Sequence, residues 1–128
     1  MTEIYEISVQ AEFAAAHCLR GYPGDCAGVH GHNWLVEAVV RCERLNGIGI
    51  GIDFRELRRF LKEITEELDH TDLNAHPAFR NGNPTSENLA RFIFRELGRK
   101  LAGRGVMVAG VRVSESPGAS VFYKERSF

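Results

Sequence analysis

The segment "ISVQAEFAAAH", residues 7–17, places an apolar side chain on every second position, and this alternation is the clearest architectural signal in the chain. The apolar positions are Ile7, Val9, Ala11, Phe13 and Ala15. A period of two is typical of a strand with one buried face. A second alternation covers residues 30–43, after the Gly/Pro-rich loop "RGYPGDCAG" of residues 20–28. The N-terminal third of the chain is therefore predicted to form two strands.

The period changes after the second predicted strand. Apolar residues recur at steps of three and four within residues 54–68, which predicts an amphipathic helix. Asp53 and Glu56 resemble a capping box at its start. A second helix is predicted from its apolar residues at positions 89, 92, 93, 97 and 101, with Thr85 or Ser86 as its N-cap. The polar segment between the two helices, residues 69–88, is long for a small domain, and such loops usually carry function.

Two further strands are predicted at residues 106–115 and 120–126, joined by the turn "SPGA". The expected order is strand, strand, helix, helix, strand, strand. Hairpins at both ends favour an α+β fold, with an antiparallel four-stranded sheet and two helices on one face. We expect a single domain over residues 1–128. Open edges on so small a sheet favour a homo-oligomer.

Composition narrows the classes of partner. Sixteen Lys and Arg balance seventeen Asp and Glu without a basic run, so no nucleic-acid footprint is visible. The chain has neither a signal-peptide pattern nor an apolar run of about 18 residues, and we expect a soluble cytoplasmic protein with no membrane partner. Three cysteines without an export signal favour reduced thiols over disulfides.

Three histidines are candidates for a metal site. His30 and His32 lie two positions apart on a predicted strand, so both project from one face, and Gly31 gives the backbone room. His17 is in phase with Phe13 at the end of the neighbouring strand, so the three imidazoles can converge at one rim of the sheet. Three neutral nitrogen ligands suit Zn²⁺ with an open fourth position, as in catalytic sites. The alternative is a group of hydrogen-bonded core histidines.

Cys26 lies in the loop that precedes these histidines, and its spacing leaves two interpretations open. As a fourth ligand it would close the shell, which is typical of structural zinc. Outside the shell, a nearby cation and a basic partner would lower the pKa of the thiol and make it a base or a nucleophile.

Two further carboxylates are candidates. Asp69 next to His70 could orient and charge-stabilise the imidazole for proton transfer; a protonated histidine that interacts with a helix C-terminus is the alternative that spacing alone favours. Glu115 ends an apolar alternation, which places it at a rim or in a pocket. A carboxylate there could bind a guanidine-like edge through two hydrogen bonds, whereas a solvated strand-end glutamate is the commoner case.

Six short motifs occur in a fixed order: "FAAAH", "CAGVHGH", "IDF", "LDHTDLN", "NPTSEN" and "SES". With these motifs the sequence resembles the 6-pyruvoyl-tetrahydropterin synthase / 6-carboxy-tetrahydropterin synthase family over essentially its whole length. The resemblance implies the tunnelling fold, in which the sheets of several subunits pair into a barrel. It also implies hexamers of two stacked trimers, with active sites at subunit interfaces.

The resemblance further implies roles for individual residues. Zinc would be bound by His17, His30 and His32. Cys26 would then be the catalytic thiol, with Asp69 and His70 as its partner in proton transfer.

For the substrate, the resemblance implies that Glu115 anchors the pterin ring. Thr85 and Ser86 match positions that line the pterin pocket, although a role as helix N-cap is sufficient to explain them. The groups that hold a triphosphate are not evident, and Arg20 and Lys124 are candidates.

Family substrates resemble 7,8-dihydroneopterin triphosphate. The short chain and the forms "LDHTDLN" and "NPTSEN" are most similar to bacterial 6-carboxy-tetrahydropterin synthases of queuosine biosynthesis, which release acetaldehyde and triphosphate. The alternatives are a 6-pyruvoyl-tetrahydropterin synthase of the biopterin pathway, a non-catalytic zinc- and pterin-binding oligomer, and a zinc hydrolase with Asp69 or His70 as base.

Overall fold

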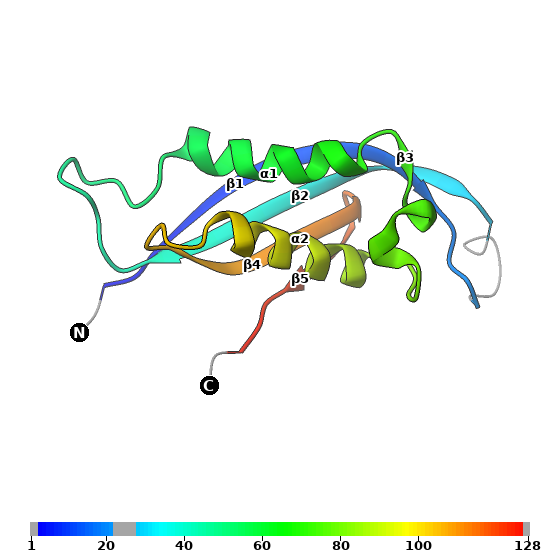
Figure 1. Ribbon diagram of the computed structural model, residues 1–128. Helices are drawn as coiled ribbons and strands as arrows, with labels where there is room; N and C mark the ends of the chain where they lie inside the picture. Colours follow the sequence, from blue (N-terminus) through cyan, green and yellow to red (C-terminus); the bar gives the residue numbers. More distant parts are fainter. Residues whose placement is uncertain (1–2, 22–27, 127–128) are drawn as a thin grey trace.

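The computed structural model describes residues 3–21 and 28–126 (Figure 1). Its strands are β1 (Tyr5–His17), β2 (His30–Cys42), β3 (Thr71–Asp72), β4 (Met107–Ser116) and β5 (Ala119–Tyr123). Its helices are α1 (Phe54–Leu68) and α2 (Ser86–Lys100), with two short 3-10 turns, η2 (Leu73–Ala75) and η3 (Pro77–Phe79), between them. Neither α1 nor α2 has the length and apolar character that a helix needs to cross a membrane.

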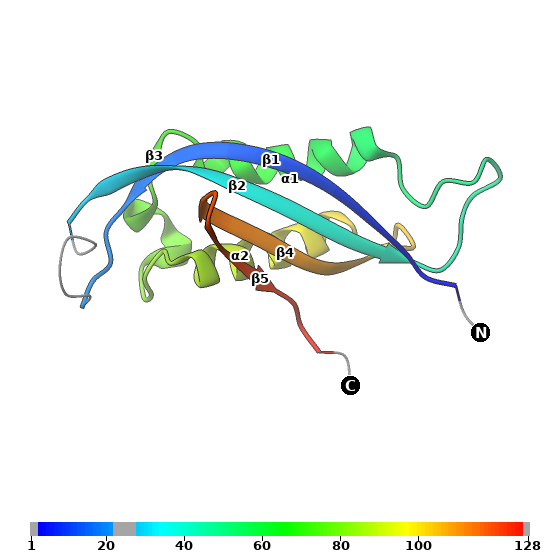
Figure 2. The same cartoon turned by 180° about the vertical axis from the view of Figure 1, so that it is seen from behind.

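The strands form one sheet in the order β3-β1-β2-β4-β5. The pairs β1/β2, β2/β4 and β4/β5 are antiparallel. Both long helices lie across the same face of this sheet, and the view from behind shows the other face uncovered (Figures 1 and 2). The α+β class and the two helices on one face are therefore as predicted.

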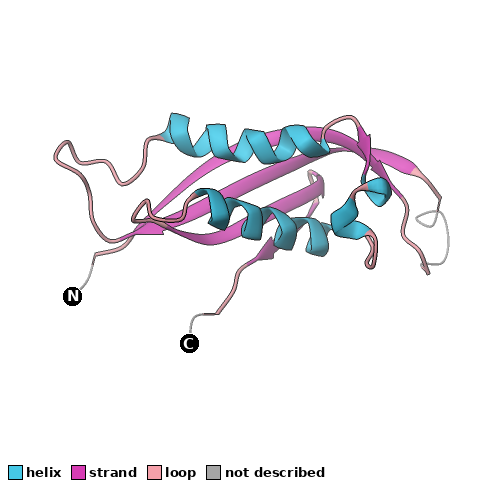
Figure 3. Cartoon of the chain, viewed as in Figure 1, coloured by secondary structure: helices cyan, strands magenta, loops and turns pink. Residues whose placement is uncertain are grey.

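The prediction of a four-stranded antiparallel sheet in the order ββααββ was wrong in the number of strands, in their directions and in the order of the elements, which is ββαβαββ. A fifth strand, β3, follows α1 and pairs in parallel with β1 at Ala15 and Ala16, so the sheet is mixed (Figure 3). β3 has only two residues, too few to show an alternation, and both are exposed and polar. Its pairing comes from tertiary contacts, because the backbone N–H of His70 donates to the Ala14 carbonyl just before it.

The core lies between the sheet and the helices, and the sequence period explains which side chains enter it. The even-numbered residues of β2 from Trp34 to Val40 are buried, as are the odd-numbered residues of β1 from Val9 to His17. Trp34 is fully buried, stacks against Phe13 with ring centroids 6.0 Å apart, and donates its indole N–H to the Ala15 carbonyl at 3.3 Å. This rigid cluster supports the end of the sheet where the histidines lie.

Candidate functional site

The register of β1 against β2 brings the three histidines to one end of the sheet. His17 is directly opposite His30, and Ala15 is opposite His32. Because alternate side chains share a face, all three imidazoles project on the helix-covered side. Glu115 of β4 joins them, and one potential ligand atom from each of the four side chains lies within 4.8 Å of the others.

Hydrogen bonds at the outer nitrogens orient two of these rings. His17 Nδ1 lies 2.8 Å from the Pro84 carbonyl oxygen, and His30 Nδ1 lies 2.7 Å from that of Gly28. A carbonyl oxygen only accepts, so each Nδ1 carries a proton, and in the neutral imidazole each Nε2 then keeps its lone pair. Fixing the tautomer by a bond at the other ring nitrogen is typical of metal-ligating histidines.

The two Nε2 atoms face each other across 3.1 Å. Two lone pairs at that distance repel unless a cation or a proton lies between them. Ligands about 2.0–2.1 Å from a tetrahedral zinc lie about 3.3 Å from each other, close to the spacing seen here. His17 and His30 thus form a donor pair suited to zinc.

His32 completes this donor set. Its Nε2 is buried and has no hydrogen bond of acceptable geometry, although Glu115 Oε1 lies 2.5 Å away. Burial lowers the pKa of His32, and the neighbouring His17 and His30 lower it further, while Glu115 opposes them. The neutral imidazole is thus favoured, and a bound cation would give this buried nitrogen a partner of acceptable geometry, which Glu115 does not provide.

Glu115 approaches the histidines from β4. It continues the inward-facing alternation of Val111 and Val113, and the β4/β5 register shifts between Ser114 and Ser116. Such irregularities re-aim side chains at the ends of strands. Glu115 Oε1 also lies 3.8 Å from His17 Nε2, and the side chain is 36% exposed. Glu115 therefore lies at a rim of the sheet as predicted, and the histidine cluster lies at the same rim.

Asp69 and His70 form the pair that their adjacency suggested. Asp69 Oδ1 accepts the backbone N–H of Ala14 at 2.8 Å, and Asp69 Oδ2 lies 3.0 Å from His70 Nδ1. The Ala14 N–H is the largest cause that lowers the pKa of Asp69. His70 adopts φ 57°, and its imidazole is 83% exposed. Within the part of the chain described, no hydrogen bond or ion pair joins this pair to the histidine cluster.

The segment "NPTSEN" supports the site through its backbone. Thr85 is the N-cap of α2 and accepts the Asn88 N–H at 3.1 Å, and Ser86 is the first helical residue. The preceding carbonyl, that of Pro84, is the partner of His17. Sequence reasoning missed Pro84, because every residue has a carbonyl and no side-chain pattern marks the one that is used.

Two asparagines hold the chain that leaves β1, and sequence reasoning missed them as well. Asn74 accepts the Cys18 N–H at 2.8 Å and donates to the Cys18 carbonyl at 3.0 Å. Asn83 makes the same pair of bonds with Arg20, both at 2.8 Å. The side-chain amides of Asn74, in "LDHTDLN", and Asn83, in "NPTSEN", thus pair with the backbone that follows His17 in the way that a neighbouring strand would. The occurrence of both asparagines in these two motifs was the feature of the sequence that could have identified them as site residues.

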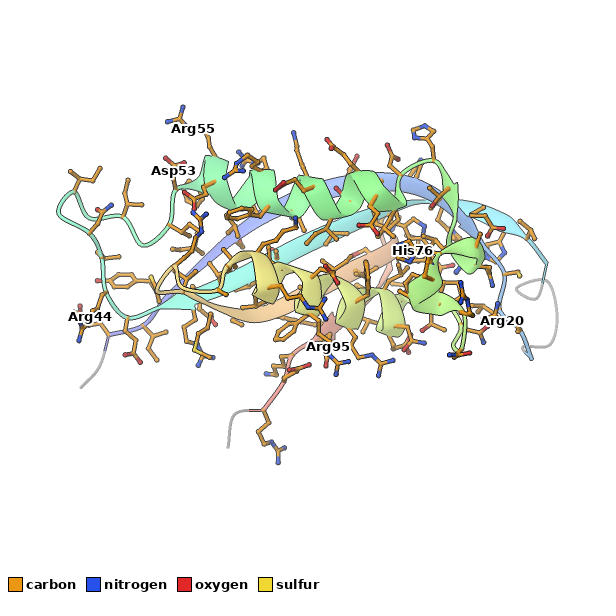
Figure 4. The ribbon with its side chains drawn as sticks, viewed as in Figure 1. Arg20, Arg44, Asp53, Arg55, His76 and Arg95 are labelled. Atoms are coloured by element: carbon orange, nitrogen blue, oxygen red, sulfur yellow. The ribbon has the colours of Figure 1, made fainter. Side chains whose placement is uncertain are left out.

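Arg20 and His76, both labelled in Figure 4, form hydrogen bonds that hold neighbouring segments of the chain together. Arg20 Nη2 donates to the carbonyls of Phe79 and Gly82, at 2.9 and 2.8 Å, so this candidate for the triphosphate is engaged in holding a loop. His76 Nε2 lies 2.7 Å from Glu67 Oε1 while its Nδ1 accepts a backbone N–H, which links η3 to α1.

Cys26 lies outside the described residues, so its predicted role is carried by the motif alone. The other two cysteines, Cys18 and Cys42, are free thiols. Lys124, the second candidate for the triphosphate, makes no ion pair within 4 Å in the described ranges 3–21 and 28–126.

Comparison with known proteins adds independent findings. The family described as "6-pyruvoyl tetrahydropterin synthase" matches residues 6–126. The chain is 37% identical to a putative 6-carboxy-5,6,7,8-tetrahydropterin synthase of Archaeoglobus fulgidus over 116 residues, which cover 91% of this chain and 92% of that protein. It is 33% identical to a dihydroneopterin monophosphate aldolase of Pyrococcus furiosus over 97 residues, covering 76% and 78%.

The fold is shared with a solved structure. The 6-pyruvoyl tetrahydropterin synthase of Caenorhabditis elegans superposes with a TM-score of 0.86 over 98% of both chains, at 24% sequence identity.

Proposed function

This chain belongs to the 6-pyruvoyl tetrahydropterin synthase family, and we propose that it is a zinc-dependent carbon–carbon lyase. Its substrates would be 7,8-dihydroneopterin triphosphate and one molecule of water, and its products 6-carboxy-5,6,7,8-tetrahydropterin, acetaldehyde and triphosphate. The observation that carries the proposal is the convergence of His17, His30 and His32, two of them with Nδ1 bonded to carbonyls and Nε2 left free. The Archaeoglobus relative supports the choice of reaction.

The metal would be held by the Nε2 atoms of His17, His30 and His32. Three neutral ligands would leave zinc its full double charge, and a bound ion would supply a Lewis acid able to polarise a side-chain hydroxyl of the substrate and to acidify the adjacent C–H. The hydrogen bonds that His17 and His30 donate to the Pro84 and Gly28 carbonyls keep the rings in place for this purpose.

Proton transfer is assigned to residues of this chain. Cys26, in its thiolate form, would remove a proton from the substrate side chain. The low pKa of Asp69 keeps its carboxylate ionised, so His70 donates its Nδ1–H to Asp69 and presents Nε2 to accept or return a second proton. The exposure of His70 is consistent with a site that a neighbouring subunit completes.

Glu115 would anchor the pterin ring, since a carboxylate can accept two hydrogen bonds from the amidine-like edge of a pterin. Thr85 and Ser86 would line the same pocket, with Thr85 also serving as helix cap. We further propose that the active form is a homo-oligomer, most simply the hexamer expected from the resemblance, that it is cytoplasmic, and that it serves queuosine biosynthesis. Light scattering of the purified protein tests whether it forms a homo-oligomer.

The test is a product assay. Zinc-loaded protein is incubated with 7,8-dihydroneopterin triphosphate, and the products are identified by mass spectrometry. We expect 6-carboxy-5,6,7,8-tetrahydropterin together with acetaldehyde. If 6-pyruvoyl-tetrahydropterin is the sole product, the chain is a biopterin-pathway synthase instead. No conversion by the zinc-loaded oligomer would indicate a non-catalytic binding protein.

A second candidate function is supported by the Pyrococcus relative, whose name describes an aldolase that acts on dihydroneopterin monophosphate. The same metal and the same base could serve both reactions. The ratio of kcat/KM for the monophosphate and the triphosphate separates them, and a clear preference for the monophosphate would favour the aldolase.

A further inference from the structure

Glu115 lies where two different ligands compete for it. Its Oε1 is 2.5 Å from His32 Nε2 and 3.8 Å from His17 Nε2, among the atoms that would hold the metal. The proposed function also requires this carboxylate to bind the edge of the pterin, which uses both of its oxygens. One carboxylate cannot bind a metal and form that two-bonded pair at the same time.

Of the four side chains in the cluster, Glu115 is the one that can exchange most easily. His17 is 1% exposed, and it and His30 are fixed at Nδ1 by carbonyl oxygens. Glu115 is 36% exposed, lies at a strand end beside a register shift, and accepts no hydrogen bond from the residues in the described ranges. The carboxylate can therefore leave the cluster at little cost to the rest of the site.

We propose that Glu115 is an exchangeable fourth metal ligand, which closes the metal site when no pterin is bound and moves to the pterin edge when one arrives. This inference rests on the proposed function for the identity of the metal and of the ligand class. A shell of three histidines and one carboxylate is four-coordinate and closed. The open position needed for Lewis acid chemistry would then appear only after the substrate ring is in place.

This exchange couples the two ligands thermodynamically. A pterin without oxygen donors on its side chain removes Glu115 from the metal and provides no ligand to replace it. Such a pterin must weaken metal binding, and the metal must weaken its binding by the same factor. The complete substrate avoids this antagonism, because its side-chain hydroxyls can replace the carboxylate.

The experiment uses the full chain, Co²⁺ as a spectroscopic substitute for zinc, and 6-methylpterin as the probe. The dissociation constant of the metal is measured by competition with a chelator, with and without saturating 6-methylpterin. The protein is tested as wild type, as Glu115→Gln, and as the matched control Glu37→Gln. Glu37 lies on the opposite face of β2, near Arg112. Circular dichroism confirms that each variant is folded.

We expect Glu115→Gln to weaken metal binding by at least about tenfold, since even the loss of an indirect partner of a ligand costs about 10–100-fold. In the wild type and in Glu37→Gln, 6-methylpterin should weaken metal binding by about fivefold or more, within the usual range of coupling. It should also change the visible spectrum of the bound cobalt. In Glu115→Gln this effect of 6-methylpterin should disappear.

Equal metal affinities of Glu115→Gln and Glu37→Gln would overturn the inference. An unchanged metal affinity of the wild type in saturating 6-methylpterin would do the same, as would failure of the metal-free wild type to bind 6-methylpterin. None of these measurements uses turnover. If the product assay fails while the coupling is present, the proposed reaction is wrong and the exchange stands; the reverse result refutes the exchange alone.

Discussion

Replacing Asn74 with alanine should loosen the part of the chain that positions His17. Asn74 makes two hydrogen bonds to the backbone of Cys18, at 2.8 and 3.0 Å, both partly buried. Each is worth about 0.5–1.5 kcal/mol net, so the free energy of unfolding should fall by about 2 kcal/mol. That corresponds to about a 30-fold change in the folding equilibrium constant.

The assay is urea denaturation of the metal-free chain, with zinc affinity measured separately. Asn83→Ala is the matched control, because Asn83 makes the same two bonds to Arg20 in a more exposed position and should cost less. Asn74→Asp should be at least as destabilising as Asn74→Ala at neutral pH, since a carboxylate oxygen would face the Cys18 carbonyl. The reasoning is refuted if Asn74→Ala changes the free energy of unfolding by less than about 0.5 kcal/mol.

Three other substitutions give distinct results. Cys26→Ala should keep its zinc, measured by elemental analysis, and lose turnover; loss of the metal would show instead that the thiol is a ligand. The pKa of Asp69 is lowered in the folded chain, chiefly by the Ala14 N–H, so its contribution to stability is present above the ordinary carboxyl pKa and is lost as the pH falls through the folded value. Melting temperatures of Asp69→Asn should therefore decline less than those of the wild type as the pH falls from about 6 to about 2, a range that extends well below the ordinary carboxyl pKa; parallel curves would contradict this. Gly110→Ala places a methyl group 2.3 Å from the Phe122 ring and should cost about 1 kcal/mol or more; the cost should shrink in a Phe122→Ala background, whereas strict additivity would exclude the clash.

The local pattern of the sequence predicted the long elements well. The alternation of apolar residues from Ile7 to Ala15 predicted β1 from strand geometry alone, and the same geometry placed His30 and His32 on one face. The apolar stripes of α1 and α2 followed from their 3.6-residue period. Asp53 was correctly predicted as the cap of α1, and Thr85 was one of the two residues predicted as the cap of α2. These features depend on residues close to one another in the chain, which is why they could be read from it.

The remaining features depend on contacts between residues far apart in sequence. β3 pairs with β1 because Asp69 and His70 form hydrogen bonds with the backbone of Ala14. The two polar residues of β3 show no alternation from which this pairing could be predicted. The tautomer of His17 depends on the Pro84 carbonyl, 67 positions away in the chain. Every residue has a backbone carbonyl, so the sequence does not identify the one that accepts this hydrogen bond. Composition and period were enough to place three histidines on one rim, since side-chain direction alternates along any strand. The approach of Glu115 to those histidines was fixed only when β4 packed beside β2, because the distance between two strands is a property of the assembled sheet.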